Sequence, residues 1–227
     1  MNYITAHRIN RLFITAIIAC LLPAAVFGQE MRKETLKGSA TPYAVFYSTG
    51  MPTDAIWPIG MKMTGDYATI RHTVEKGNGD NLSVNDKVPF RFIIAPTDGV
   101  PTNSSDTRYW AAAMGFNTGT GGANTNLNPG WTSSYVQAGC LDYYTTEFPK
   151  ETWRLPTQRE LMLMWLFRDA INAIYPSGQM TSTRSYWCAT EKDATNAWLL
   201  EYNETSPQFK PVSKVTGSIY FRCVKDY

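Results

Sequence analysis

Cysteine side chains are the groups in this chain most able to form a covalent bond or bind a metal. The chain has 227 residues, with cysteines at Cys20, Cys140, Cys188 and Cys223 and only two histidines. No C-x-x-C pair occurs, so we expect neither a zinc site nor another cofactor. In an oxidising compartment two of the last three cysteines should pair, and spacing alone leaves the choice open.

A charged motif at residues 153–161 (WRLPTQREL) is the second candidate for chemistry. Arg154, Arg159 and Glu160 resemble catalytic groups, but no nucleophile or histidine accompanies them. Thr157 followed three residues later by Glu160 is the signature of a capping box, in which each side chain accepts a hydrogen bond from the other residue's backbone N–H. The motif therefore predicts a helix start, with its charged residues in structural ion pairs and caps.

A long Gly-, Asn- and Thr-rich segment, residues 117–130, is the candidate ligand loop. Binding residues often lie on long loops that a rigid scaffold holds. The candidate residues are Asn117, Asn124, Asn126 and Trp131. The alternative interpretation is a mobile surface insertion without a binding role.

Two other polar features have structural interpretations. Residues 77–81 (GNGDN) offer oxygen ligands but lack EF-hand spacing, so a plain turn is favoured over a calcium site. Residues 66–75 alternate between two faces, which predicts a strand and makes His72 a half-buried strand residue rather than a catalytic base.

The N-terminus indicates export. Residues 1–11 are basic, residues 12–26 are apolar, and Val26 and Gly28 place small residues at the −3 and −1 positions of a cleavage site, which is the pattern of a signal peptide over residues 1–28. The apolar run is too short and interrupted for a transmembrane anchor. A lipoprotein is the alternative, because residues 17–20 (IIAC) resemble a lipobox, although the apolar run continues past Cys20.

Charge argues against two classes of partner. The chain has 21 basic and 19 acidic residues, and the two arginines in excess, Arg8 and Arg11, lie in the signal peptide. The remaining chain is near neutral, which disfavours a nucleic-acid or polybasic membrane role. No other apolar stretch is long enough to span a bilayer, and residues 29–227 suffice for one sizeable core.

The elements that must position these groups are short strands and two helices. We expect a loose leader at residues 29–37, a strand or short helix at 108–116, and a helix at 131–145. Residues 161–167 (LMLMWLF) are all apolar, which predicts that the helix opened by Thr157 is buried on every side. The other predicted strands are 42–48, 88–95, 186–190, 197–202, 211–215 and 219–224. This order indicates an α+β fold.

Four separated motifs resemble a known family. They are Cys140, the WRLPT-x-x-EL motif, YW-x-ATE at residues 186–191 and RCV-x-D at residues 222–226. In this order they are similar to the C-type-lectin-like domains of bacterial surface proteins, in particular the "WRLPT" group among fimbrillin-associated and major paralogous domain proteins. The resemblance covers roughly residues 88–227. It implies a C-type-lectin-like fold, with two helices packed on short antiparallel strands.

The resemblance also has implications for the cysteines. In that family a long disulfide joins the first helix to the last strand, which implies a Cys140–Cys223 bridge here. Cys188 stands where the family commonly has serine, so we expect a buried free thiol, with pairing to another cysteine as the alternative. The calcium-and-sugar triplets of animal lectins are absent from the sequence. Formylglycine-generating enzymes share the fold but need a reactive cysteine pair, which a lone Cys188 does not supply.

These expectations combine into a functional hypothesis. Residues 1–28 are a signal peptide, 29–86 an N-terminal β-rich extension and 87–227 a C-type-lectin-like domain. We expect a non-enzymatic adhesion protein of a Gram-negative bacterium, at the cell surface, outer membrane or periplasm and associated with fimbriae. It would bind a glycan, a host surface protein or a pilus subunit. The alternatives are a periplasmic enzyme on the formylglycine-generating version of the fold and a purely structural pilus or envelope subunit.

Overall fold

The computed structural model describes nine stretches of the chain: residues 28–36, 38–51, 70–71, 91–99, 110–114, 139–192, 195–203, 205–217 and 219–227. Within these stretches no helix is both long and apolar enough to cross a membrane. The side chains of Ile70, Arg71, Ala111 and Glu191 are not described.

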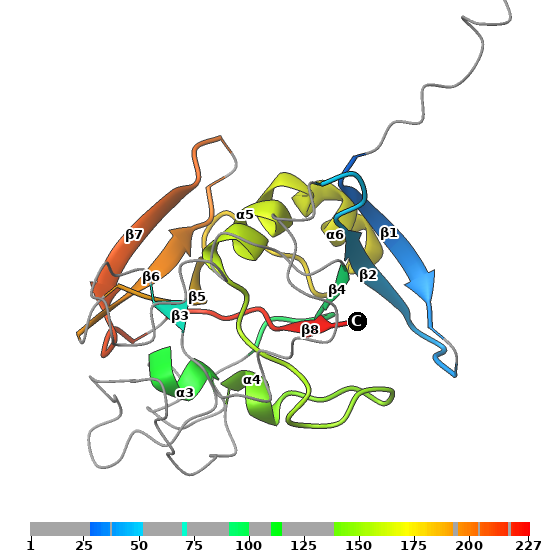
Figure 1. The fold of residues 1–227 in the computed structure, drawn as a ribbon, viewed down its shortest axis with the longest axis horizontal. Helices are drawn as coiled ribbons and strands as arrows, with labels where there is room; N and C mark the ends of the chain where they lie inside the picture. Colours follow the sequence, from blue (N-terminus) through cyan, green and yellow to red (C-terminus); the bar gives the residue numbers. More distant parts are fainter. Residues whose placement is uncertain are drawn as a thin grey trace, which may run out of the picture.

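Among the described residues, the first sheet has four strands in the order β1-β2-β4-β8 (Figure 1). They are β1 (Glu30–Thr35), β2 (Pro42–Tyr47), β4 (Arg91–Ile94) and β8 (Val224–Asp226), and each neighbouring pair is antiparallel. β1 and β2 come from the stretch assigned to an N-terminal extension, while β8 ends the chain. The two ends of the described chain therefore share one sheet.

The expectation of a loose leader at residues 29–37 is wrong. Glu30–Thr35 forms β1, which pairs with β2 over six residues in register from Glu30 opposite Tyr47 to Thr35 opposite Pro42. The charged side chains also make local contacts, since the Arg32 guanidinium lies 4.4 Å from the centre of the Tyr47 ring. Pairing with a buried neighbour makes this polar segment a strand.

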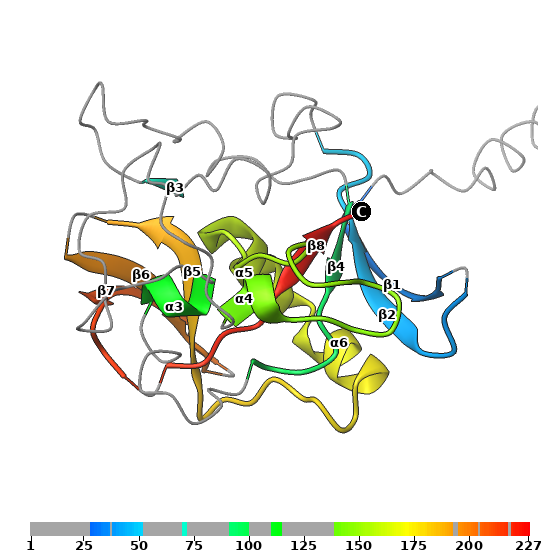
Figure 2. The same cartoon turned by 90° about the horizontal axis from the view of Figure 1, so that it is seen from below.

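The second sheet has the order β3-β5-β6-β7. Its strands are β3 (Ile70–Arg71), β5 (Ser185–Glu191), β6 (Asn196–Glu201) and β7 (Gln208–Ser213). β5, β6 and β7 are antiparallel neighbours, whereas β3 pairs with β5 in parallel. Figure 2 shows β1 and β2 at the opposite side of the molecule from β6 and β7.

Two of the predicted strands are displaced along the chain. The strand predicted at 211–215 begins and ends earlier in the chain, at Gln208–Ser213. The strand predicted at 219–224 is replaced by isolated bridges at Tyr220 and Phe221, and β8 begins only at Val224. Arg222 and Asp226 of the terminal RCV-x-D motif form ion pairs in two clusters, which are described below. The segment between Tyr220 and β8 makes isolated bridges in place of a continuous strand pairing.

Among the described residues four helices flank the sheets, which confirms an α+β fold. α3 (Trp110–Met114) and α4 (Gly139–Asp142) lie on one side, and α5 (Gln158–Leu166) and α6 (Arg168–Ile174) lie on the other (Figure 1). Of the helix expected at 131–145, the described part is α4 at Gly139–Asp142. Residues 143–145 are not helical, and residues 131–138 lie outside the described stretches.

The apolar run at 161–167 does not form a helix buried on every side. Leu161 and Met164 are buried, but Leu166 is 57% exposed. At Phe167 the backbone leaves helical geometry, with φ −100° and ψ 16°, so α5 ends and α6 begins. The break lets each short helix cover its own part of the two sheets.

Alternating strand residues point into two separate cores. One, the helix-side core, packs against α5 and α6; the other, the disulfide-side core, packs against α3 and α4. The helix-side core consists of Ala44, Phe46, Phe92, Ile94, Leu161, Leu163, Met164, Ile171, Tyr175, Met180, Tyr186, Cys188, Leu200, Tyr202 and Val224. The disulfide-side core consists of Leu36, Tyr43, Val45, Tyr47, Ile93, Ala95, Trp110, Ala113, Met114, Cys140, Leu141, Trp153, Leu155, Trp187, Ala189, Ala197, Leu199, Phe221 and Cys223.

Candidate functional site

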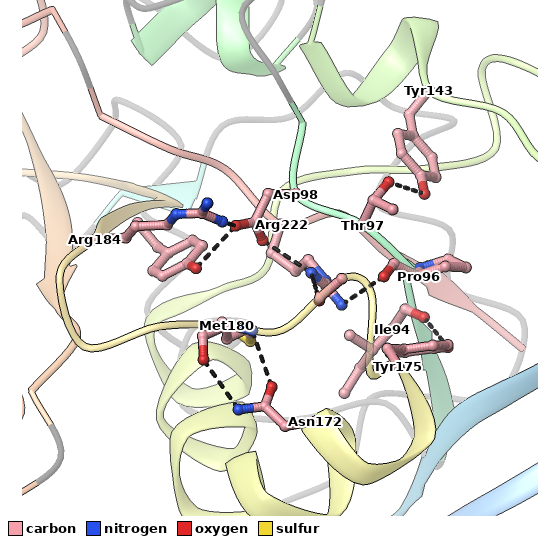
Figure 3. Close-up of polar contacts among 12 residues, drawn as sticks. Ile94, Pro96, Thr97, Asp98, Tyr143, Asn172, Tyr175, Met180, Arg184 and Arg222 are labelled. Carbon is pink, nitrogen blue, oxygen red and sulfur yellow. Dashed lines mark hydrogen bonds and ion pairs between the residues drawn. The ribbon is translucent and has the colours of Figure 1, made fainter.

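A buried polar cluster surrounds Asp98, in the turn that follows β4 (Figure 3). One carboxylate oxygen accepts a hydrogen bond from Arg222 Nη1 at 2.9 Å. The other accepts from the Tyr186 hydroxyl at 3.0 Å and from Arg184 Nη1. The Asp98 side chain is only 5% exposed. We call these four residues the Asp98 cluster.

Arg222 connects the cluster to two loops. Its Nη1 also donates to the Gly178 carbonyl at 2.8 Å, and its Nη2 donates to the Pro96 carbonyl at 3.0 Å. The Arg222 side chain is fully buried. A buried guanidinium is tolerated when a carboxylate and further acceptors replace its water shell. Asp98 and the two carbonyls do so for the terminal nitrogens of Arg222, whereas its Nε is buried without a hydrogen-bond partner among the described residues.

Two glycines allow the backbone to approach the cluster closely. A Cβ at Gly178 would lie 2.1 Å from the Pro96 carbonyl oxygen, and a Cβ at Gly99 would lie 1.7 Å from Phe221 Cε2. Any side chain at either position would push these segments apart. The sequence thus brings the turn after β4, the loop after α6 and the C-terminal segment together around Arg222.

Arg184 forms the outer part of the cluster. Its side chain is 32% exposed, and its guanidinium stacks on Tyr220 with 4.4 Å between Cζ and the ring centre. Burial works against its charge, but the hydrogen bond and the charge of Asp98 together raise the pKa of Arg184 above its ordinary value.

The cluster holds fixed charges rather than a mobile proton. Burial, with the added charge of Asp98, raises the pKa of Tyr186 above its ordinary value, so its hydroxyl remains a donor at neutral pH. The raised pKa of Arg184 likewise keeps it charged. This chemistry suits holding or recognising a charged group more than general acid–base catalysis.

A second buried cluster surrounds Arg154, at the start of the charged motif. Its Nη1 and Nη2 each donate to the Glu160 carboxylate at 2.7 Å, and Nη2 also donates to Asp226 at 2.6 Å. Although burial opposes the charge, Asp226 and Glu160 raise the pKa of Arg154. The predicted capping box is present, with Thr157 and Glu160 each accepting from the other's backbone N–H. The ion pair and the cap expected of Arg154 and Glu160 are thus present, and Arg159 lies exposed on α5.

Cys140 and Cys223 form a disulfide with 5.5 Å between their Cα atoms. Cys188 is a buried free thiol, as expected, and its Sγ donates to the Trp198 carbonyl at 3.1 Å. Cys188 belongs to the helix-side core, whereas the disulfide lies in the other core. Burial raises the pKa of the Cys188 thiol to about 12, so almost none of it is the reactive thiolate at neutral pH.

Several candidates from the sequence lie outside the described residues. They are the ligand-loop residues Asn117, Asn124, Asn126 and Trp131, together with His72, the turn at 77–81 and Cys20. Across the parts of the chain that are described, no three His, Cys, Asp or Glu side chains gather as metal ligands would.

The sequence did not indicate the Asp98 cluster. Arg222 lies in the RCV-x-D motif, but nothing near it in the sequence marks Asp98 or Arg184 as its partners. Asp98 lies 124 positions from Arg222 and 86 from Arg184. The only local signal is a turn-forming Thr-Asp-Gly run at residues 97–99.

Comparison of the sequence with models of known protein families and with characterised proteins finds no match.

Proposed function

We propose that this protein is an exported binding protein of a Gram-negative cell surface, built on a C-type-lectin-like scaffold and associated with fimbriae. Its ligand would be a glycan, a host surface protein or a pilus subunit. In this proposal the folded core has the structural role, and loops and half-exposed side chains around it make the contacts with the ligand.

The observation that carries the proposal is the convergence of the four motifs. The Cys140–Cys223 disulfide joins α4 to the terminal motif. Arg154 and Val224 exchange two backbone hydrogen bonds, of 2.9 and 2.8 Å. Ala189, in the YW-x-ATE strand, donates its N–H to the Pro156 carbonyl at 2.7 Å. Motifs that the resemblance treats as parts of one domain thus contact one another directly.

Cys188 weighs against the enzymatic alternative. The formylglycine-generating version of the fold requires a reactive cysteine, and reactivity requires thiolate. Burial in the helix-side core raises the pKa of this thiol to about 12, and its Sγ donates to a backbone carbonyl. A thiol in that state is a packing group. The purely structural alternative, a pilus or envelope subunit, is separated from the binding proposal by experiment.

The test measures binding by the full chain, exported from a Gram-negative host with its own N-terminus. The labelled protein is applied to an array of neutral and acidic oligosaccharides and to a panel of extracellular-matrix proteins. The matched control is the same protein reduced and unfolded. Saturable binding that the control lacks supports the proposal.

Two results would overturn it. One is the absence of binding on both panels, which supports a structural subunit when the chain also co-purifies with a cell-surface polymer. The other is turnover of a substrate that disappears in a Cys188→Ser variant, which supports an enzyme.

A further inference from the structure

The Asp98 cluster carries an excess of positive charge. Arg184 and Arg222 both form ion pairs with Asp98, the only carboxylate among the described residues that pairs with either of them. One carboxylate therefore balances two guanidinium groups. An excess charge that is partly removed from water is a favourable partner for an anion.

Of the two arginines in the cluster, Arg184 is the one that a ligand can reach. Arg222 is fully buried, and both of its terminal nitrogens already donate to protein acceptors. Arg184 is 32% exposed and directs one terminal nitrogen at Asp98. Among the residues drawn in Figure 3, the dashed line from the Arg184 guanidinium runs to Asp98 alone. A ligand could therefore meet Arg184 without disturbing Arg222.

The Arg184 guanidinium is held in place before any ligand arrives. Tyr220 covers one face of the group, 4.4 Å from its Cζ. Asp98 fixes one edge, and Tyr186 and Arg222 fix Asp98 in turn. Because the orientation is already set, little side-chain entropy is lost when an anion binds.

We propose that Arg184 is an oxyanion-binding site that takes a carboxylate or sulfate group of the protein's ligand. The planar guanidinium matches the paired oxygens of such a group. The inference rests on the proposed binding function and names the chemical class that this site recognises. The oxyanion comes either from an acidic glycan or from a free small anion, and the experiment separates these two sources.

The first arm of the test uses small anions. Side-chain N–H signals of the arginines are followed by NMR while the full chain is titrated with sodium sulfate or acetate, against sodium chloride at equal ionic strength. We expect a saturable shift of the Arg184 signal. Arg91 is the matched control, since it also stacks on a tyrosine, Tyr227, with 4.2 Å between Cζ and the ring centre. No saturable shift at Arg184, or an equal one at Arg91, overturns the proposal.

The second arm compares a sulfated or carboxylated oligosaccharide with its neutral analogue. We expect Arg184→Gln to weaken binding of the acidic form about tenfold or more, the loss of one charge-assisted pair, and to leave the neutral form unchanged. Arg184→Lys, which keeps the charge but not the fork, should give an intermediate loss. Arg91→Gln should bind as the wild type does.

The outcomes separate this inference from the proposed function. Unchanged acidic-glycan binding by a folded Arg184→Gln variant overturns the oxyanion site and leaves the binding function intact. A saturable sulfate shift at Arg184 without binding of any glycan or protein keeps the site, assigns it to a free anion and overturns the proposed function. If Arg184→Gln does not fold, Tyr220→Leu tests the same site by removing the stacking partner.

Discussion

Cys188 is expected to be unreactive, because its buried surroundings keep the thiol protonated. We predict that iodoacetamide does not label Cys188 in the native protein at mildly alkaline pH, because burial raises its pKa to about 12 and only the thiolate reacts. Mass spectrometry of the native protein and of the denatured protein measures the labelling. Cys188→Ser keeps a donor for the Trp198 carbonyl, so it should change the unfolding free energy by less than about 1 kcal/mol. Rapid labelling of the native protein would contradict this prediction.

The negative charge of Asp98 stabilises both arginines of the Asp98 cluster. Asp98→Asn leaves the fully buried Arg222 without its carboxylate, so we predict a loss of about 3–5 kcal/mol in unfolding free energy. Urea denaturation with the disulfide intact measures it. Asp169, whose side chain is 90% exposed beside Arg168, is the matched control, and Asp169→Asn should stay within about 0.5 kcal/mol of the wild type. Similar midpoints for the two variants would contradict the role assigned to Asp98.

At this scale the sequence predicts local pairs and misses distant ones. Thr157 and Glu160 lie three residues apart, so the capping box follows from helix geometry alone. The partners of Arg222 are fixed only when three segments pack together, and Gly178 matters because the Pro96 carbonyl lies against it. Neither contact has a local pattern, and this is why Asp98 and Arg184 could not be predicted.

Helix α5 depends on Thr157, the residue that caps its N-terminus. Thr157→Ala removes the acceptor for the Glu160 N–H, which is 3.1 Å from the hydroxyl oxygen. We predict a loss of about 1–2 kcal/mol in unfolding free energy, the upper part of the usual range because Thr157 is fully buried. Thr157→Ser keeps the hydroxyl and should lose less than half as much. Equal losses in the two variants would indicate that the methyl group, not the cap, stabilises α5. Urea denaturation measures both.

Strands are predictable from the sequence where their residues are mostly apolar. They are missed where only pairing with a neighbouring strand makes a polar segment a strand. β2 and β4 are almost wholly buried, and their apolar residues made both strands predictable. β1 is Glu-Met-Arg-Lys-Glu-Thr, with charges on both faces, so its sequence has no apolar alternation to detect. It is a strand because β2 offers six residues of unpaired backbone beside it.

The molecule as a whole should lose stability at alkaline pH. Burial is the main cause that raises the pKa of Tyr175, Tyr186 and Cys188 above their ordinary values of 10.0, 10.0 and 9.0. The unfolded chain therefore loses these protons first, so stability is fully present below about pH 9 and falls as pH rises toward 12 and beyond. The loss of circular dichroism in that window should be accompanied by a step in phenolate absorbance, because unfolding frees the buried Tyr175 and Tyr186 to ionise. The decline should be shallower in Cys188→Ser, and unfolding in that window without such a step would contradict the prediction.

The disulfide connects the parts of the molecule that the sequence keeps far apart. Cys223 lies between Arg222 of the Asp98 cluster and β8, whose Asp226 pairs with Arg154, so the tether at Cys140 holds both ion clusters to α4. The bridge closes 83 residues, and loop-closure entropy gives it about 4–5 kcal/mol. We predict that the double variant Cys140→Ala/Cys223→Ala loses about that much unfolding free energy in urea. Cys188→Ala, which leaves the bridge intact and removes one buried sulfur, should lose only about 1 kcal/mol. Equal urea midpoints for these variants would show that packing, rather than the covalent link, holds the C-terminal segment against α4.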